Sequence, residues 1–179
     1  IRNNIYTGEN QDANREQKGW NTANFNDSSW TDVSFRSAPS QNIVAQQLYP
    51  IRNVETIPAQ YMNKLNDSLY VFDLGRNIAG VTKLKIKGKA GAMVRLIHTE
   101  RLSPNGRVDL GRISNFHRPT DEEDLFQTDT YVLSGKGEDV FMPKFNYKGF
   151  RYVEVSCSEP MELKKECLTG YFMHNDVPE

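Results

Sequence analysis

The stretch 142–157, with the sequence MPKFNYKGFRYVEVSC, restricts the possible folds of this chain more than any other. Within it, the apolar residues Val153, Val155 and Cys157 alternate with polar neighbours that include Glu154. A period of two is typical of a strand with one buried face and one wetter face. Aromatic residues crowd the start of the stretch and favour the same pleated, half-buried surface. The pattern therefore predicts a central strand of an all-β domain.

Short strand-like runs separated by turn signals continue along the chain. Thr82, Leu84 and Ile86 alternate with lysines, and the turn-forming residues 88–91 follow them as in a hairpin. Further strands are expected over Asn42–Tyr49, Ile51–Ile57 and about residues 166–174, with polar or irregular loops at Asn63–Ser68 and Arg107–Asp124. About ten such runs, without the pattern of a long helix, predict an antiparallel β-sandwich.

An irregular point is expected inside the run 70–80. Gly75 and Gly80 flank Asn77, and glycine permits the backbone conformations that a bulge or a close approach between strands requires. The sequence therefore predicts a bulge or tight bend beside Asn77.

Composition excludes several classes of partner. The 179 residues carry a formal net charge of −1 with both signs interspersed, which gives no electrostatic basis for binding nucleic acid or an anionic membrane. No apolar run approaches the ~20 residues that span a bilayer. For Cys157 and Cys167, two buried reduced thiols are favoured over a cross-strand disulfide. Because the chain starts at Ile1 without an initiator Met, we expect a piece of a longer protein, whose location in the cell stays open.

Several strings of residues resemble one enzyme family. The pattern P-x-F-x-Y-x-G-F-R-Y-V-E-V at 143–155 resembles the end of the β-sandwich that precedes the catalytic domain in bacterial α-L-rhamnosidases, glycoside hydrolase family 78. Further strings that resemble this family lie at 5–20 with the adjoining Phe25–Trp30, at 49–56, at 70–80 and at 127–143. Three positions depart from the family pattern: Asn14 stands for Arg, Arg76 for Gln and Val81 for Trp.

This resemblance implies a fold, a domain division and a function. Residues 1–37 would be the tail of an upstream jelly-roll accessory domain, and residues 38–179 would form a concanavalin-like β-sandwich. The family's catalytic acid and base belong to a helical (α/α)6 barrel, so the resemblance implies no catalytic residue in this chain. The parent enzyme would hydrolyse terminal α-L-rhamnosides with inversion, and this piece would support the barrel, its partner in the same parent chain. A bacterial parent of this kind would be periplasmic or secreted.

Four residues are candidates for binding carbohydrate. Asp73 and Asn77 could hydrogen-bond a sugar or ligate calcium through oxygen, although tying the bend together through backbone amides is the favoured role. Trp20 and Tyr61 could be stacking platforms for a sugar ring. The sequence requires no cofactor. Binding of calcium is the one alternative, and no residue is assigned as a metal ligand.

Other polar and aromatic residues have structural interpretations. Arg151 is expected to clamp a carboxylate of a neighbouring strand or domain, and Trp30 to anchor the jelly-roll edge. His98, His117 and His174 are scattered, without Ser or Cys partners at recognisable spacing, and are expected to be structural or exposed.

Two other functions remain open from the sequence. One is an autonomous carbohydrate-binding module that holds rhamnose, with or without calcium. The other is a structural spacer or interaction domain, which would expose a large apolar patch where its partner belongs.

Overall fold

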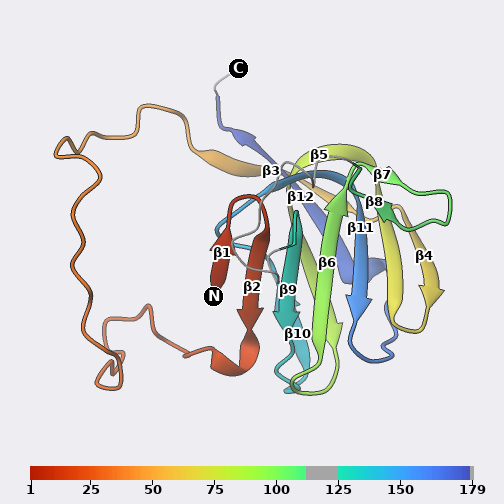
Figure 1. Ribbon diagram of the computed structural model, residues 1–179, viewed down its shortest axis with the longest axis horizontal. Helices are drawn as coiled ribbons and strands as arrows, with labels where there is room; N and C mark the ends of the chain where they lie inside the picture. The colour runs from red at the N-terminus through yellow and green to blue at the C-terminus, as the bar shows by residue number, and fades with distance from the viewer. Residues whose placement is uncertain (112–124, 178–179) are drawn as a thin grey trace.

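The computed structural model describes residues 1–111 and 125–177, and these residues are almost entirely β-structure (Figure 1). The strands are β1 (Arg2–Asn4), β2 (Gly8–Asp12), β3 (Ile51–Pro58), β4 (Tyr61–Asn66), β5 (Leu69–Lys87), β6 (Met93–Thr99), β7 (Arg101–Leu102), β8 (Val108–Asp109), β9 (Thr128–Val132), β10 (Glu138–Phe141), β11 (Lys148–Cys157) and β12 (Leu168–Asn175). Two 3-10 helices of three residues, η1 (Ala13–Arg15) and η3 (Lys165–Cys167), complete the described elements. The all-β prediction is confirmed.

Strand β5 organises the sheet, because its 19 residues pair with four other strands. Its first part pairs with β11 and β4, and its second part pairs with β12 and β10. The resulting ten-stranded sheet has the order β1-β2-β9-β6-β11-β5-β12-β3, with β4 and β10 paired to β5 off this path. In Figure 1, β2, β9, β6 and β11 lie side by side, while β12 and β3 cross behind them. The long strand therefore belongs to both layers of a curled sheet.

The predicted irregularity in β5 is present. Asp73 pairs with Tyr152 of β11 and Ile78 pairs with Phe150, so residues 74–77 of β5 lie opposite the single residue Arg151. Gly75 takes a φ of 84°, a conformation that glycine adopts without a steric penalty. This bulge redirects β5 at the point where its partners change.

The core lies between the layers and follows the predicted alternation. Leu84 and Ile86 are buried while Lys85 and Lys87 are exposed, and Val153 and Val155 are fully buried. Phe72, Phe141 and Phe150 fill the same cluster. Both cysteines are free thiols as predicted, but only Cys157 is buried, whereas Cys167 is partly exposed. Burial raises the pKa of Cys157 to about 11.

Three local predictions are wrong. Asn42–Tyr49 forms no strand and its apolar side chains are exposed, because no neighbouring strand is there to pair with it. Most of the expected loop Asn63–Ser68 is instead part of the edge strand β4, which β5 holds by backbone pairing. Glu154 is fully buried, although the alternation predicted that it faces solvent. Arg107 packs over it and donates two hydrogen bonds of 2.7 and 2.6 Å to its carboxylate.

Residues 16–50 leave the sheet altogether. Figure 1 shows them as a long irregular excursion between η1 and β3. Every one of these residues is exposed except the half-buried Phe25. The excursion therefore adds almost nothing to the core of the domain.

The close approach of β5 and β12 predicts a position that tolerates glycine alone. A Cβ atom on Gly80 would lie 1.9 Å from the Tyr171 carbonyl oxygen, whereas one on Gly149 would meet Glu100 at an ordinary 3.6 Å. We expect Gly80→Ala to lower the free energy of unfolding by about 1–3 kcal/mol or more, as overpacking does. Gly149→Ala, on the paired strand, should stay within about 0.5 kcal/mol of the parent chain. Urea unfolding of the two variants measures the difference, and equal midpoints would contradict this prediction.

Candidate functional site

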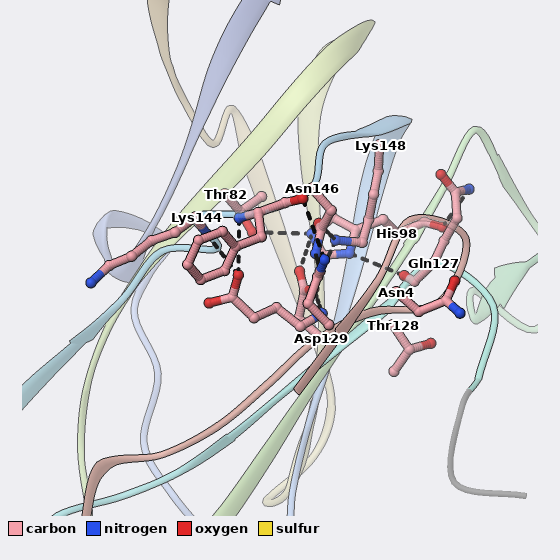
Figure 2. Close-up of polar contacts among 12 residues, drawn as sticks. Asn4, Thr82, His98, Gln127, Thr128, Asp129, Lys144, Asn146 and Lys148 are labelled. Atoms are coloured by element: carbon pink, nitrogen blue, oxygen red, sulfur yellow. Dashed lines mark hydrogen bonds and ion pairs between the residues drawn. The ribbon is translucent and has the colours of Figure 1, made fainter. Parts of the chain in front are cut away.

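A group of polar side chains is sealed inside the domain where β2, β5, β6, β9 and the start of β11 meet (Figure 2). Here it is called the buried polar cluster and consists of Glu9, Thr82, His98, Asp129, Asn146 and Lys148, all of them buried. Buried charges are costly unless they are paired or hydrogen-bonded. The contacts inside the cluster therefore decide what it does.

Asp129 is the centre of the cluster. Its Oδ1 atom accepts from Lys148 Nζ at 2.7 Å and from the Glu9 backbone N–H at 2.8 Å. Lys148 also donates to Asn146 Oδ1 at 2.5 Å. Burial lowers the pKa of Lys148, and the Asp129 carboxylate opposes that shift. These bonds attach β2 and the start of β11 to β9.

His98 is held as a neutral ring. Its Nδ1 atom lies 3.2 Å from the Gln127 carbonyl oxygen, which can only accept, so Nδ1 carries the hydrogen. Nε2 is then free to accept from the Thr82 hydroxyl at 3.0 Å. The ring also packs edge-on against Phe150, with centroids 4.7 Å apart. The pKa of His98 is lowered to about 4. Burial is the largest cause, and the nearby charge of Lys148 is the second.

Glu9 fixes the chain just before β11. Its Oε2 atom accepts from the backbone N–H groups of Lys144 and Phe145 at 2.8 and 3.1 Å. Within the described residues, Glu9 Oε1 and Asp129 Oδ2 have no hydrogen-bond partner. Both residues are fully buried, so a substrate bond cannot lie between their carboxylates. The cluster joins strands and is not a pair of catalytic acids.

The bulge in β5 forms a second polar site. Arg151 Nε and Nη2 donate to the two oxygens of Asp73 at 2.8 and 2.9 Å, and the Gly75 N–H donates to Asp73 Oδ1 at 2.6 Å. The hydrogen bond from Arg151 is the main cause that lowers the pKa of Asp73. Both Asp73 oxygens are thus occupied by groups of the chain itself, the clamp expected of Arg151.

Three of the four carbohydrate candidates lie on or beside this bulge. Asn77 is an exposed residue of the bulge, and Tyr61 lies directly opposite Asp73 in the pairing of β4 with β5. Tyr61 is highly exposed on its edge strand. Trp20 lies elsewhere, on the excursion 16–50.

Trp20 lines a cavity of about 560 Å³, here called the tryptophan pocket. The residues around it are Ile1, Arg2, Asn10, Gln11, Asp12, Arg15, Glu16, Gln17, Trp20, Trp30, Thr130, Val132, Lys144 and Phe145. Trp30, expected only as an anchor, packs against Phe25 at a centroid distance of 5.4 Å and also lines this pocket.

The remaining candidates are accounted for as follows. His174 is exposed, and His117 lies outside the described residues. Over residues 1–111 and 125–177 no group of three or more His, Cys, Asp or Glu side chains could hold a metal ion. In the same ranges no helix is long and apolar enough to cross a membrane.

Sequence reasoning missed the buried polar cluster. Glu9 and Asp129 are 120 positions apart, so no local spacing connects them. The available signal is that both lie inside family-like strings, at 5–20 and 127–143. Taken alone, the acidic side chain of Asp129 suggests a solvated surface, and its full burial contradicts that interpretation.

Comparison with known proteins assigns the chain to a family. A model of the bacterial alpha-L-rhamnosidase concanavalin-like domain matches residues 63–174, and one of the alpha-L-rhamnosidase N-terminal domain matches residues 1–55. The chain is 35% identical to an alpha-L-rhamnosidase of Streptomyces avermitilis over 97% of its own length and 16% of that protein. It is also 35% identical to one from Formosa agariphila, over 86% of this chain and 16% of that protein.

Solved structures agree with the sequence matches. The chain superposes on the S. avermitilis alpha-L-rhamnosidase complexed with L-rhamnose with a TM-score of 0.81, covering 97% of this chain and 16% of that one. The alpha-L-rhamnosidase from Dictyoglumus thermophilum gives a TM-score of 0.83 at 31% identity, covering 98% of this chain and 19% of that one. The chain thus spans less than a fifth of the length of these relatives.

The neutral state of His98 predicts a pH dependence of stability. The pKa of His98 is about 4 in the fold and 6.5 in its ordinary state, so between these values the unfolded chain binds a proton that the folded chain does not. Stability therefore falls as the pH drops through this window, by about 3 kcal/mol in all for this group. The free energy of unfolding, measured from pH 7 to pH 4, should fall more steeply for the parent chain than for His98→Gln.

Comparing the two curves removes the contribution of carboxylates that titrate in both proteins. Parallel curves would contradict the assignment. NMR gives a reading that needs no variant, because the ring signals of His98 should remain those of a neutral imidazole at pH 5.

Proposed function

The chain belongs to the bacterial α-L-rhamnosidase family, and on this basis we propose that it is a non-catalytic β-sandwich of a longer α-L-rhamnosidase. The parent protein would hydrolyse terminal α-L-rhamnosides with inversion. A helical (α/α)6 barrel elsewhere in the parent would carry the catalytic acid and base. This domain would pack against the barrel and hold it in place.

The single observation that carries the proposal is the share of each protein that the sequence match covers. The match extends over 97% of this chain but 16% of the S. avermitilis relative, so most of a protein of that kind lies outside these residues. The chemistry of the domain agrees. Glycoside hydrolysis needs two carboxyl groups on either side of a bound sugar, about 5 to 9.5 Å apart, and the carboxyl groups of Glu9 and Asp129 are buried away from any substrate.

The excursion 16–50 supports a role in contacts with other parts of the parent. Between residues 33 and 48 it exposes five large apolar side chains: Val33, Phe35, Ile43, Val44 and Leu48. Exposed apolar side chains gathered in one segment often mark a surface that contacts another part of a protein. We propose that further parts of the parent cover this segment.

The proposed division at residue 37 places β1 and β2 with an upstream jelly-roll unit. β2 nevertheless pairs in parallel with β9, three residues against three. Under this division the upstream unit and the sandwich share one sheet, which would keep their orientation fixed.

An activity assay tests the proposal. The purified chain should release nothing from an aryl α-L-rhamnoside, whereas the parent protein should hydrolyse it. In the parent, Gly80→Ala should shorten the half-life of activity at raised temperature and leave kcat/KM at low temperature nearly unchanged, because the substitution loosens a support and touches no catalytic group. Gly149→Ala is the matched control. Release of rhamnose by the chain alone would overturn the proposal.

A further inference from the structure

We propose that Lys148 and Asp129 become joined by an intramolecular isopeptide bond, an amide between their two side chains, and that Glu9 carries the proton that this reaction moves. The two side chains meet inside the buried polar cluster (Figure 2). The bond is a covalent modification of the fold itself. It does not depend on the function proposed above.

The two reacting groups are held in contact. Lys148 Nζ lies 2.7 Å from Asp129 Oδ1, and the two side chains are 5% and 0% exposed. They come from the start of β11 and from β9, two strands that are not neighbours in the sheet. A reaction between groups already fixed in contact avoids most of the entropy cost of bringing them together. The fold therefore presents the amine to the carboxyl group without further ordering.

The surroundings favour the uncharged groups that react. Only a neutral amine is a nucleophile, and desolvation favours the neutral form of a lysine. Burial is the largest cause that lowers the pKa of Lys148. Transfer of one proton from Lys148 to Asp129 turns the buried ion pair into an amine and a carboxylic acid. The amide that they form carries no charge, so it also removes the cost of keeping two charges away from water.

The backbone of Glu9 stabilises the charge that develops during the attack. The Glu9 N–H donates to Asp129 Oδ1 at 2.8 Å. When an amine attacks a carboxyl carbon, negative charge gathers on the oxygen that stays, and a preorganised donor on that oxygen lowers the barrier. Oδ1 is therefore the oxygen that becomes the carbonyl oxygen of the amide.

The two unpartnered oxygens of the cluster fit the remaining roles. Within the described residues, Asp129 Oδ2 and Glu9 Oε1 are buried without a hydrogen-bond partner. Buried polar atoms are almost always partnered, so two such atoms in one cluster call for an explanation. The charge of Glu9 acts on Lys148, which places its carboxyl group beside the reacting amine. Oε1 is then the position for a proton in transit, and Oδ2 is the oxygen that leaves.

The step is a condensation. The neutral Lys148 Nζ attacks Cγ of Asp129, which is protonated on Oδ2, and a C–N bond forms. Glu9 takes one proton from the nitrogen and one proton passes to Oδ2, so the C–Oδ2 bond breaks and Oδ2 leaves as water. The amide nitrogen keeps one hydrogen. No group is oxidised or reduced, and Glu9 ends in its starting state.

Asn146 orients the amine and is not its target. Lys148 donates to Asn146 Oδ1 at 2.5 Å, and Asn146 Nδ2 donates to Asn3 Oδ1 at 2.7 Å. A bond to Asn146 would release ammonia and join residues only two positions apart. A bond to Asp129 spans 19 positions and ties β9 to the start of β11. A crosslink of this length restricts the unfolded chain and stabilises the fold.

Mass spectrometry tests the bond directly. The 179-residue chain, denatured and reduced, should be lighter than its sequence mass by one water molecule. A tryptic digest of the parent protein should contain a branched fragment, in which the chain is uncut after Lys148 and is attached to the fragment that carries Asp129. The digest of the parent gives a result even if the chain does not fold by itself.

Variants separate the three roles. Lys148→Arg keeps a positive charge without a primary amine, and Asp129→Ala removes the carbon that is attacked, so both should show the full sequence mass. Glu9→Gln keeps the backbone N–H but cannot carry the proton. It should slow bond formation about a hundredfold or more, as loss of a general acid–base group does, while it keeps the circular dichroism of the parent chain. Lys144→Arg is the matched control, because Lys144 is an exposed lysine of the same segment, and it should lose water like the parent chain.

Each outcome supports the proposal or overturns part of it. Normal cleavage after Lys148 in the parent protein, without a branched fragment, would overturn the bond and leave the pair as a salt bridge. Loss of ammonia instead of water would overturn Asp129 as the target. Full and rapid bridging in Glu9→Gln would overturn the role of Glu9. A bond found in the parent alone would support the proposal and show that the rest of the parent is needed to close the cluster. None of these readouts involves hydrolysis of a rhamnoside, so the proposed function is tested separately.

Discussion

The bulge in β5, held by the pairing of Arg151 with Asp73, is the constraint on which the sheet depends. A single 19-residue strand serves both layers, so it must change direction without losing its backbone partners. Residues 74–77 accommodate this change opposite one residue of β11. Arg151 occupies both oxygens of Asp73 at that point. A bidentate pair of this kind specifies geometry as well as adding energy. The two halves of β5 therefore keep a defined angle to each other.

The buried polar cluster fixes the position of β2 in the sheet. β2 joins the sheet through a short parallel pairing with β9, which supplies few backbone bonds. Asp129, Lys148 and Glu9 add side-chain bonds that also reach the chain before β11. Burying these charges costs desolvation energy that their pairing only partly returns. What the cluster contributes is a unique position for β2, because sliding this strand would take the Glu9 carboxylate away from the N–H groups of Lys144 and Phe145 and the Glu9 N–H away from Asp129.

The sequence predicted features that depend on neighbours in the chain. Alternation identified the buried faces of β5 and β11, and the glycines around Asn77 located the bulge. Prediction failed where the decisive partner lies far away. Asn42–Tyr49 has apolar residues but no strand beside it. Asn63–Ser68 is an exception, because most of it pairs as β4 with the adjacent strand β5, and its polar composition rather than distance concealed the strand. Glu154 is buried because Arg107, 47 residues away, covers its charge. The buried polar cluster and the tryptophan pocket were missed for the same reason.

The tryptophan pocket shows how such distant contacts create a site. Its floor comes from β2 and β9, and its walls come from the excursion 16–50 and the chain before β11. Taken alone, Trp20 and Trp30 are two exposed aromatic residues in a polar, turn-rich segment. Placed over a strand pair whose other face is fixed by Asp129 and Glu9, they become walls of a cavity with a rigid floor. The interactions that attach β2 to the sheet therefore also shape the tryptophan pocket, so a change that releases β2 should open the pocket as well as loosen the fold.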